Sequence, residues 1–165
     1  MLNRRQAIGA LACAAALEAA PLKSRFIGVW KLIRFERKLK DGRMEYPYGE
    51  KPVGRITYDK AGRMSAQLMR PGRRSAVPPG LNFIAGNANQ DEITEAVSGY
   101  AAYFGTYDVD EASTTVIHHV HGALVPSWVG TDLKRTYHFE GKQRLLLSAT
   151  TAAGVLDLLW EKEPD

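Results

Sequence analysis

Short runs of alternating apolar and polar residues, separated by turn signals, extend from Phe26 to the end of the chain and limit what it can fold into. Runs of this length and period predict antiparallel strands joined by tight turns. Asp41-Gly42 and the turn "DKAG" at 59–62 are typical of hairpins. Because strands do not alternate with helices and no fixed repeat is present, the pattern favours an all-β, up-and-down barrel. The first strand, "GVWKLIRFERKLK", must then pair with a late one, and "LLWEKE" is its natural partner.

Two segments depart from the strand pattern. Residues 71–90 are rich in Pro, Gly and Asn and predict a long loop of the kind that often forms a lid or a binding loop. Residues 89–104, "NQDEITEAVSGYAAYF", predict the one internal helix, with Asn89 and Glu92 resembling a capping box at its start. The helical spacing is carried by Ile93, Ala96, Val97, Tyr100 and Ala101.

The N-terminus has the three-part layout of a secretory signal. A basic head, "MLNRR", precedes the apolar run "AIGALACAAAL" and the small residues "EAAP". We therefore expect residues 1–20 to be a cleavable signal and residues 21–165 to be one barrel domain. "NRRQAI" resembles a twin-arginine motif, which predicts export to the periplasm. The alternative is a buried or frayed N-terminal helix on a cytoplasmic protein.

Composition and motifs exclude several classes of function. The only cysteine, Cys13, lies in the predicted signal, so the mature domain has neither a disulfide framework nor a thiol nucleophile. No later segment is long and apolar enough to span a membrane as a helix. No nucleophile elbow, phosphate loop, dinucleotide fingerprint or HExxH motif is present, and we expect no cofactor.

The net charge of +4 comes from scattered basic residues. The densest cluster contains Arg63, Arg70, Arg73 and Arg74. A nucleic-acid-binding face would be continuous and interleaved with aromatic residues, so we expect a solvated loop here and no nucleic-acid partner.

Three of the four histidines fall within four positions, at His118, His119 and His121. Alternation along a strand sends His118 to one face and the other two to the opposite face. A zinc site needs three or four ligands, and only His138, on another strand, could join the pair. We therefore expect the pair to face solvent and to hold no metal.

His118 shares its face with Val116 and Val120, which predicts that it points into the barrel. A histidine inside a cavity can move protons near neutral pH. It can equally be a core residue whose nitrogens are satisfied by a tyrosine or a backbone carbonyl. The sequence leaves both interpretations open.

Two further strands offer candidate wall residues. One face is formed by Tyr103, Gly105, Tyr107 and Val109, and another by Leu133, Arg135, Tyr137 and Phe139. If both faces point inwards, they line an apolar cavity with a few polar groups, which is typical of a small-molecule site. Tyr107 and His118 could then act as an acid–base pair on a ketone or epoxide, and Arg135 could hold an oxygen. Alternatively, Arg135 is an exposed strand residue.

Trp128, in "VPSW" between strands, is expected at the rim of the barrel, whereas Trp30 and Trp160 are expected in the core. Gln67, Met69 and Arg70 lead into the long loop and are expected at the opposite rim. The predicted ligand-binding residues are Gln67, Met69, Arg70, Tyr103, Tyr107, His118, Trp128 and Arg135.

Gly28-Val29-Trp30 resembles the G-x-W signature of lipocalins. More specifically, the chain resembles the bacterial and fungal lipocalin-like domain family from about Gly28 to Lys162. The resemblance is carried by "GVWKLIRFE", "YPYGEKPVGRITYDKAGRMSAQLMRPGR", "GYAAYFGTYDVDE", "VIHHVHGALVPSWVGTDLKR" and "LLWEK". It implies a small, calycin-type antiparallel barrel with a ligand cavity. It also implies an alternative for Arg135, which in barrels of this type can pack over the G-x-W tryptophan, Trp30, and close the barrel end. Two positions depart from the pattern, with His121 where an acidic residue is common and Leu133 where glutamine is common.

The leading hypothesis is a barrel that binds a small, largely apolar ligand. The alternative is a cofactor-free isomerase, cyclase or lyase in which His118 and Tyr107 move protons. A third hypothesis is a metal- or haem-binding barrel built on His119 and His121. Since one fold hosts many functions, the resemblance does not choose among them.

Overall fold

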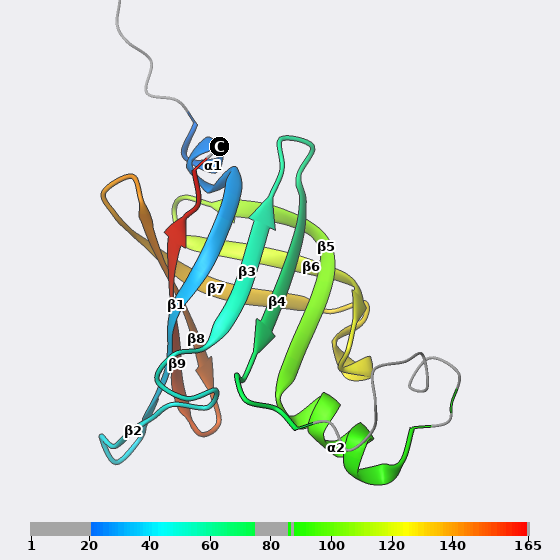
Figure 1. The fold of residues 1–165 in the computed structure, drawn as a ribbon. Helices are drawn as coiled ribbons and strands as arrows, with labels where there is room; N and C mark the ends of the chain where they lie inside the picture. Colours follow the sequence, from blue (N-terminus) through cyan, green and yellow to red (C-terminus); the bar gives the residue numbers. More distant parts are fainter. Residues whose placement is uncertain (1–20, 75–85, 87, 165) are drawn as a thin grey trace, which may run out of the picture.

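In the computed structural model, which describes residues 21–74, 86 and 88–164, antiparallel strands form one continuous sheet (Figure 1). The nine strands are β1 (Gly28–Leu39), β2 (Met44–Glu45), β3 (Val53–Tyr58), β4 (Arg63–Met69), β5 (Tyr100–Asp110), β6 (Thr115–Ala123), β7 (Asp132–Glu140), β8 (Arg144–Thr151) and β9 (Gly154–Lys162). Each of β3 to β8 pairs with the next strand along the chain, and β1 pairs with β3. The short β2 only extends β1, so eight of the nine strands make up the barrel wall.

The barrel closes between the first and last strands. The register of β1 against β9 runs from Trp30 opposite Lys162 to Leu39 opposite Gly154. This confirms the closure predicted from the sequence. The predicted signal, residues 1–20, and most of the predicted loop, at 75–85 and 87, lie outside the described residues.

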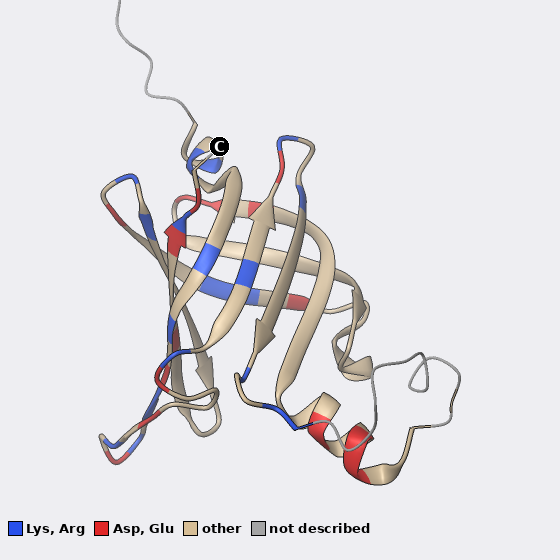
Figure 2. Cartoon of the chain, viewed as in Figure 1, with Lys and Arg blue, Asp and Glu red and all other residues tan. Residues whose placement is uncertain are grey.

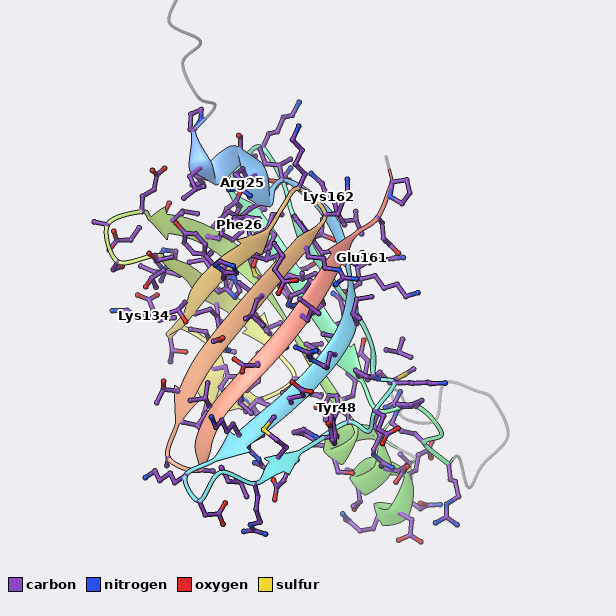
Figure 3. The ribbon with its side chains drawn as sticks, turned by 90° about the vertical axis from the view of Figure 1, so that its left-hand side faces the viewer. Arg25, Phe26, Tyr48, Lys134, Glu161 and Lys162 are labelled. Carbon is purple, nitrogen blue, oxygen red and sulfur yellow. The ribbon has the colours of Figure 1, made fainter. Side chains whose placement is uncertain are left out.

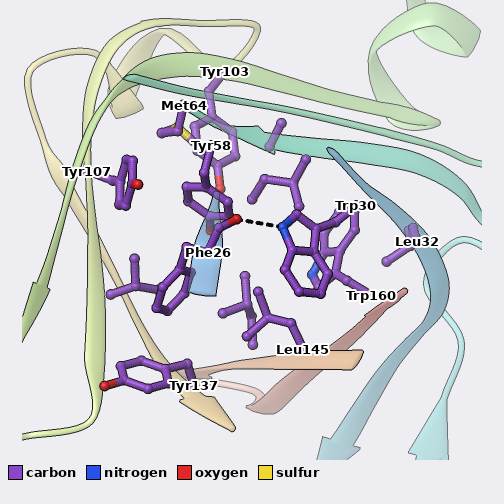
Figure 4. Packing of buried hydrophobic residues seen from close by; sticks show 14 of the residues in the cluster. Phe26, Trp30, Leu32, Tyr58, Met64, Tyr103, Tyr107, Tyr137, Leu145 and Trp160 are labelled. Atoms are coloured by element: carbon purple, nitrogen blue, oxygen red, sulfur yellow. Dashed lines mark hydrogen bonds between the residues drawn. The ribbon is translucent and has the colours of Figure 1, made fainter. Parts of the chain in front are cut away.

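The interior of the barrel is filled from alternate positions of each strand (Figure 4). In β3 and β4 the residues that share one parity of the alternating pattern are all buried: Ile56, Tyr58, Met64, Ala66 and Leu68. Trp30 and Trp160 are 0% and 1% exposed, as expected for core residues. The alternation in the sequence therefore identified the inner faces correctly.

Two strand irregularities adjust these faces. The register of β1 against β9 shifts between Leu32 and Arg34, so Leu32 and Phe35 both face inwards although three positions separate them. A second shift, in β5, occurs between Phe104 and Gly105. A side chain at Gly105 would meet the carbonyl oxygen of His119 at 1.9 Å, so only glycine fits at this close approach.

Helices lie at the two ends of the barrel (Figure 1). The short α1 (Leu22–Phe26) was not predicted, and its Phe26 is fully buried at one end. The predicted internal helix is α2 (Gln90–Ser98), whose first turn is capped by the Asn89 side chain accepting from the Glu92 amide. The prediction ran too far, because Tyr100 and Ala101 begin β5.

Lysines and arginines are spread over the strands and turns (Figure 2), and three arginines of the basic cluster have local side-chain partners. Arg63 forms an ion pair with Asp59, and Arg70 forms one with Glu95 of α2. Arg73 donates to the carbonyl oxygen of Ala96. Within the part of the chain that is described, no helix has the length and apolar character needed to cross a bilayer.

Candidate functional site

A cavity of about 250 Å³ lies inside the barrel. Its walls come from seven strands, the segment between β2 and β3, and the short η1 helix (Pro126–Trp128). The lining residues are Phe35, Tyr48, Ile56, Leu68, Ala101, Tyr103, Trp128, Arg135, Leu147, Leu156, Leu158 and Trp160. Apolar and aromatic side chains dominate this wall, and Arg135 is the only charged residue among the described residues that line it.

The two ends of the barrel differ in character. Phe26 and Arg25 lie at one end and Tyr48 lies towards the other (Figure 3). Phe26 packs at the first end against Tyr58, Tyr137 and Phe139, with ring centroids 5.0–5.4 Å apart. Tyr48, which lines the cavity, packs edge-on against Phe35 at 5.3 Å.

Trp128 and Arg135 both line the cavity. The Trp128 ring meets the Tyr103 ring edge-on at a centroid distance of 5.7 Å. Arg135 is half-buried and donates to the carbonyl oxygen of Lys134. The cation that lies over the first-strand tryptophan is the Lys162 ammonium, 5.4 Å from the centroid of the Trp30 ring, whereas Arg135 lies on the cavity wall.

His118 is fully buried and points into the barrel, as predicted. Its Nε2 lies 2.8 Å from the hydroxyl of Tyr58, and its Nδ1 lies 2.9 Å from the hydroxyl of Tyr103. Both ring nitrogens are therefore hydrogen-bonded to phenols. The sequence identified His118 and Tyr103 as interior residues, but it did not single out Tyr58 as a partner.

Burial decides the protonation state of this group. Loss of solvation, with a smaller effect from the Arg135 charge, lowers the pKa of His118 to about 3. Burial likewise raises the pKa of Tyr58 and of Tyr103. All three side chains are consequently neutral at neutral pH, and the imidazole carries one proton.

The predicted acid–base pair of Tyr107 and His118 needs correction. The two residues are opposite one another in the β5–β6 register, but the Tyr107 hydroxyl donates to the carbonyl oxygen of Asp59 at 3.3 Å. Tyr107 also does not line the cavity. The alternation predicted that Tyr107 is on the inner face, but alternation does not show how far along the barrel a residue lies. Tyr107 lies towards the end that Phe26 closes.

The comparison with protein families bears on the whole barrel. The model of the lipocalin-like domain matches residues 27–162. The chain belongs to the lipocalin-like domain family. This confirms the resemblance found in the sequence, from the G-x-W motif to the end of β9.

Individual relatives of this lipocalin-like domain were also found. It is 36% identical over 84 residues to the 4'-hydroxy-3'-methoxypropiophenone carrier protein ppsC of Aspergillus oryzae (strain ATCC 42149 / RIB 40), an alignment covering 47% of this chain and 72% of that protein. Among solved structures it is similar to a redesigned β-barrel, with a TM-score of 0.43, 10% identity, and coverage of 86% of this chain and 95% of that one. A de novo designed fluorescence-activating β-barrel gives a TM-score of 0.42, 9% identity, and coverage of 86% and 96%.

Five of the eight predicted ligand-binding residues do not line the interior cavity of this lipocalin-like domain. His118 and Tyr107 are interior residues outside its lining, and Gln67, Met69 and Arg70 lie elsewhere. Gln67 and Met69 alternate with the buried residues of β4 and line a hollow of about 430 Å³ on the outer face of β3 and β4. Arg70 is held by its ion pair with Glu95. These residues were predicted at the rim because they precede the long loop. The alternation along β4 already indicated that Gln67 and Met69 face outwards.

His119 faces outwards, as predicted, but it has partners that the sequence did not reveal. Its Nδ1 lies 2.7 Å from Asp132 and its Nε2 lies 3.2 Å from Asp108, on the two neighbouring strands. These contacts, that to Asp132 first, raise the pKa of His119. Among the described residues no group of three His, Cys, Asp or Glu is arranged to hold a metal ion. His121 and Leu133, the two departures from the family pattern, are exposed and half-buried respectively.

Proposed function

We propose that this lipocalin-like barrel binds and carries a small, largely apolar aromatic molecule in its interior cavity. The observation that carries the proposal is the composition of the cavity wall, which is apolar and aromatic apart from a few polar groups. Sites of this make-up hold small molecules by burial and orient them through the polar groups. The carrier protein from Aspergillus oryzae, whose name gives an aromatic ketone as its cargo, supports the same class of ligand.

The size of the cavity limits the ligand. A volume of about 250 Å³ lies just below the range of roughly 300–1,000 Å³ usual for ligand pockets. One aromatic ring with a short side chain is the scale of molecule that such a space accepts. Edge-to-face contact with Trp128 or Tyr48 would favour a flat ring over an aliphatic chain of equal area.

Titration with propiophenone tests the proposal. Trp128 and Trp160 line the cavity, so ligand entry should change the intrinsic fluorescence of the protein. Adjacent residues of β5 provide a matched pair of variants, because Ala101 lines the cavity and Ala102 does not. Ala101→Phe fills part of the cavity, whereas Ala102→Phe adds the same ring elsewhere on the same strand.

We expect saturable binding to the wild-type protein and to Ala102→Phe. Ala101→Phe should weaken binding by about tenfold or more, which corresponds to at least ~1.4 kcal/mol. Equal affinity of the two variants would contradict binding in the interior cavity. Absence of saturable binding by wild-type protein to any small aromatic ketone would contradict the proposed ligand class.

A further inference from the structure

Tyr58, His118 and Tyr103 form a chain of three neutral groups joined by two hydrogen bonds. A neutral imidazole has one N–H and one bare nitrogen, so it donates one of these bonds and accepts the other. The chain holds three protons, one on each group, and its two internal bonds use only two of them. One phenolic proton must therefore point out of the chain, and the tautomer of His118 decides which tyrosine carries it.

The surroundings of the two tyrosines are unequal. Tyr58 is 1% exposed, does not line the cavity, and has only His118 as a hydrogen-bond partner for its hydroxyl among the described residues. Tyr103 lines the cavity. A buried donor without an acceptor is strongly disfavoured. The unused proton is therefore tolerated at Tyr103, where a cavity occupant can accept it, and not at Tyr58.

We infer that His118 carries its proton on Nδ1 and that Tyr103 presents its hydroxyl proton to the cavity, which thereby selects aromatic ligands bearing an acceptor oxygen. In this arrangement Tyr58 donates to Nε2, and Nδ1–H donates to the Tyr103 oxygen. The inference rests on the proposed function and adds the polar group that recognises the ligand. Tyr58 and His118 are positioning residues, since they act through Tyr103.

Other groups around the cavity are also hydrogen-bond donors. Arg135 carries only donors, and none of the lining residues is acidic. The indole N–H of Trp160, another lining residue, is buried and has no hydrogen-bond partner in the described part of the chain. A ligand with a ketone, ether or phenolate oxygen complements this wall, whereas one that offers only donors leaves it unsatisfied.

Propiophenone and propylbenzene share a skeleton and differ in the carbonyl oxygen, so they isolate this contact. Calorimetric titration of the wild-type protein should show tighter binding of propiophenone. Tyr103→Phe should lower the affinity for propiophenone by about three- to tenfold, the range expected for one neutral hydrogen bond. It should change the affinity for propylbenzene by less than about twofold. Tyr137→Phe, which removes a hydroxyl from a core residue away from the cavity lining, should leave both affinities unchanged.

Long-range ¹H–¹⁵N correlation spectra of the wild-type protein give an independent readout, because protonated and bare imidazole nitrogens resonate far apart. His118→Gln assigns the signal. Protonation at Nδ1 supports the inference, and protonation at Nε2 overturns it even if Tyr103→Phe fails to fold. The inference is also overturned if a folded Tyr103→Phe variant loses the same factor of affinity for both ligands. If neither ligand binds the wild-type protein, the proposed function fails for this ligand class and the selectivity fails with it, whichever tautomer is observed.

Discussion

The indole N–H of Trp30 donates a 2.7 Å hydrogen bond to the carbonyl oxygen of Phe26. This bond, drawn in Figure 4, ties the short helix α1 to the inner face of the first barrel strand. The tryptophan of the G-x-W motif therefore holds the residues that precede the barrel. The segment from Leu22 to Phe26 lies within the predicted domain, 21–165, and contributes Phe26 to its core, but its helical form was not predicted.

Phe26→Ala should destabilise the protein by about 3–5 kcal/mol, the usual cost of removing a buried aromatic ring. The ring packs against Tyr58, Tyr137 and Phe139, so its loss leaves a void that the closed strands cannot fill. Urea denaturation measures the change in the free energy of unfolding. The control is Phe104→Ala, at a residue that is 58% exposed, which should cost less than about 1 kcal/mol. Similar losses in the two variants would show that α1 does not close the barrel.

Acid should destabilise the protein through His118. Its pKa is about 3 in the folded protein and 6.5 when unperturbed, so the unfolded chain binds more protons between these values. The stabilisation is fully present above about pH 6.5 and is lost as the pH falls towards 3, by up to ~1.4 kcal/mol per pH unit. Urea denaturation at about pH 6.5 and about pH 5 should give a steeper loss for wild type than for His118→Gln. Parallel losses would mean that His118 is protonated in the folded state.

His119 should have the opposite effect at higher pH. Its pKa is raised, chiefly by Asp132, so its contribution is fully present below the unperturbed value of 6.5 and is lost as the pH rises through the folded value. Because the pair is partly exposed, the loss should stay below about 1 kcal/mol and shrink with added salt. Thermal melts at about pH 6 and about pH 9 should show a smaller shift for His119→Gln than for wild type. His121→Gln, at an exposed residue on the same strand, serves as the control and should follow the wild-type protein.

Arg135 should favour ligands that carry a negative charge. Of the lining residues that the structure describes, it alone is charged, and a charge-assisted hydrogen bond is about twice as strong as a neutral one. For 4-hydroxypropiophenone, wild-type affinity should rise by about threefold or more as the pH passes the pKa of the ligand phenol. Arg135→Met should abolish this rise, and Arg55→Met, at an exposed residue on the outer face of β3, should retain it. An unchanged pH profile in Arg135→Met would exclude a direct contact.

The sequence predicted the barrel and its inner faces because alternation and turn chemistry are local signals. The strands, the closing pair and the interior position of His118 all followed from them. Depth along the barrel is not local, since it depends on the stagger between neighbouring strands. For this reason the sequence suggested Tyr107 as the partner of His118. The residue that does bond to His118, Tyr58, lies on β3, two strands away from β5, and was not recognised.

Two further features could not be read from alternation. The bulge in β1 changes which residues face inwards after Leu32, and it brings Phe35 to the cavity wall. Asp108 and Asp132 flank His119 only because β5 and β7 lie on either side of β6. Asp132 lies directly opposite His119 in the β6–β7 register. Predicting how these two strands pair would therefore have revealed this contact.

Closure of β1 against β9 also has a kinetic consequence. The two strands that seal the barrel are separated by nearly the whole chain, so their contact has a very large sequence separation. Proteins dominated by such contacts fold slowly, in roughly milliseconds to seconds, because the long loop must be closed before the contacts form. A nascent chain cannot complete this barrel until β9 has left the ribosome. Until then β1 presents an open edge to its surroundings, and the barrel can fold cooperatively only once β9 is available to pair with it.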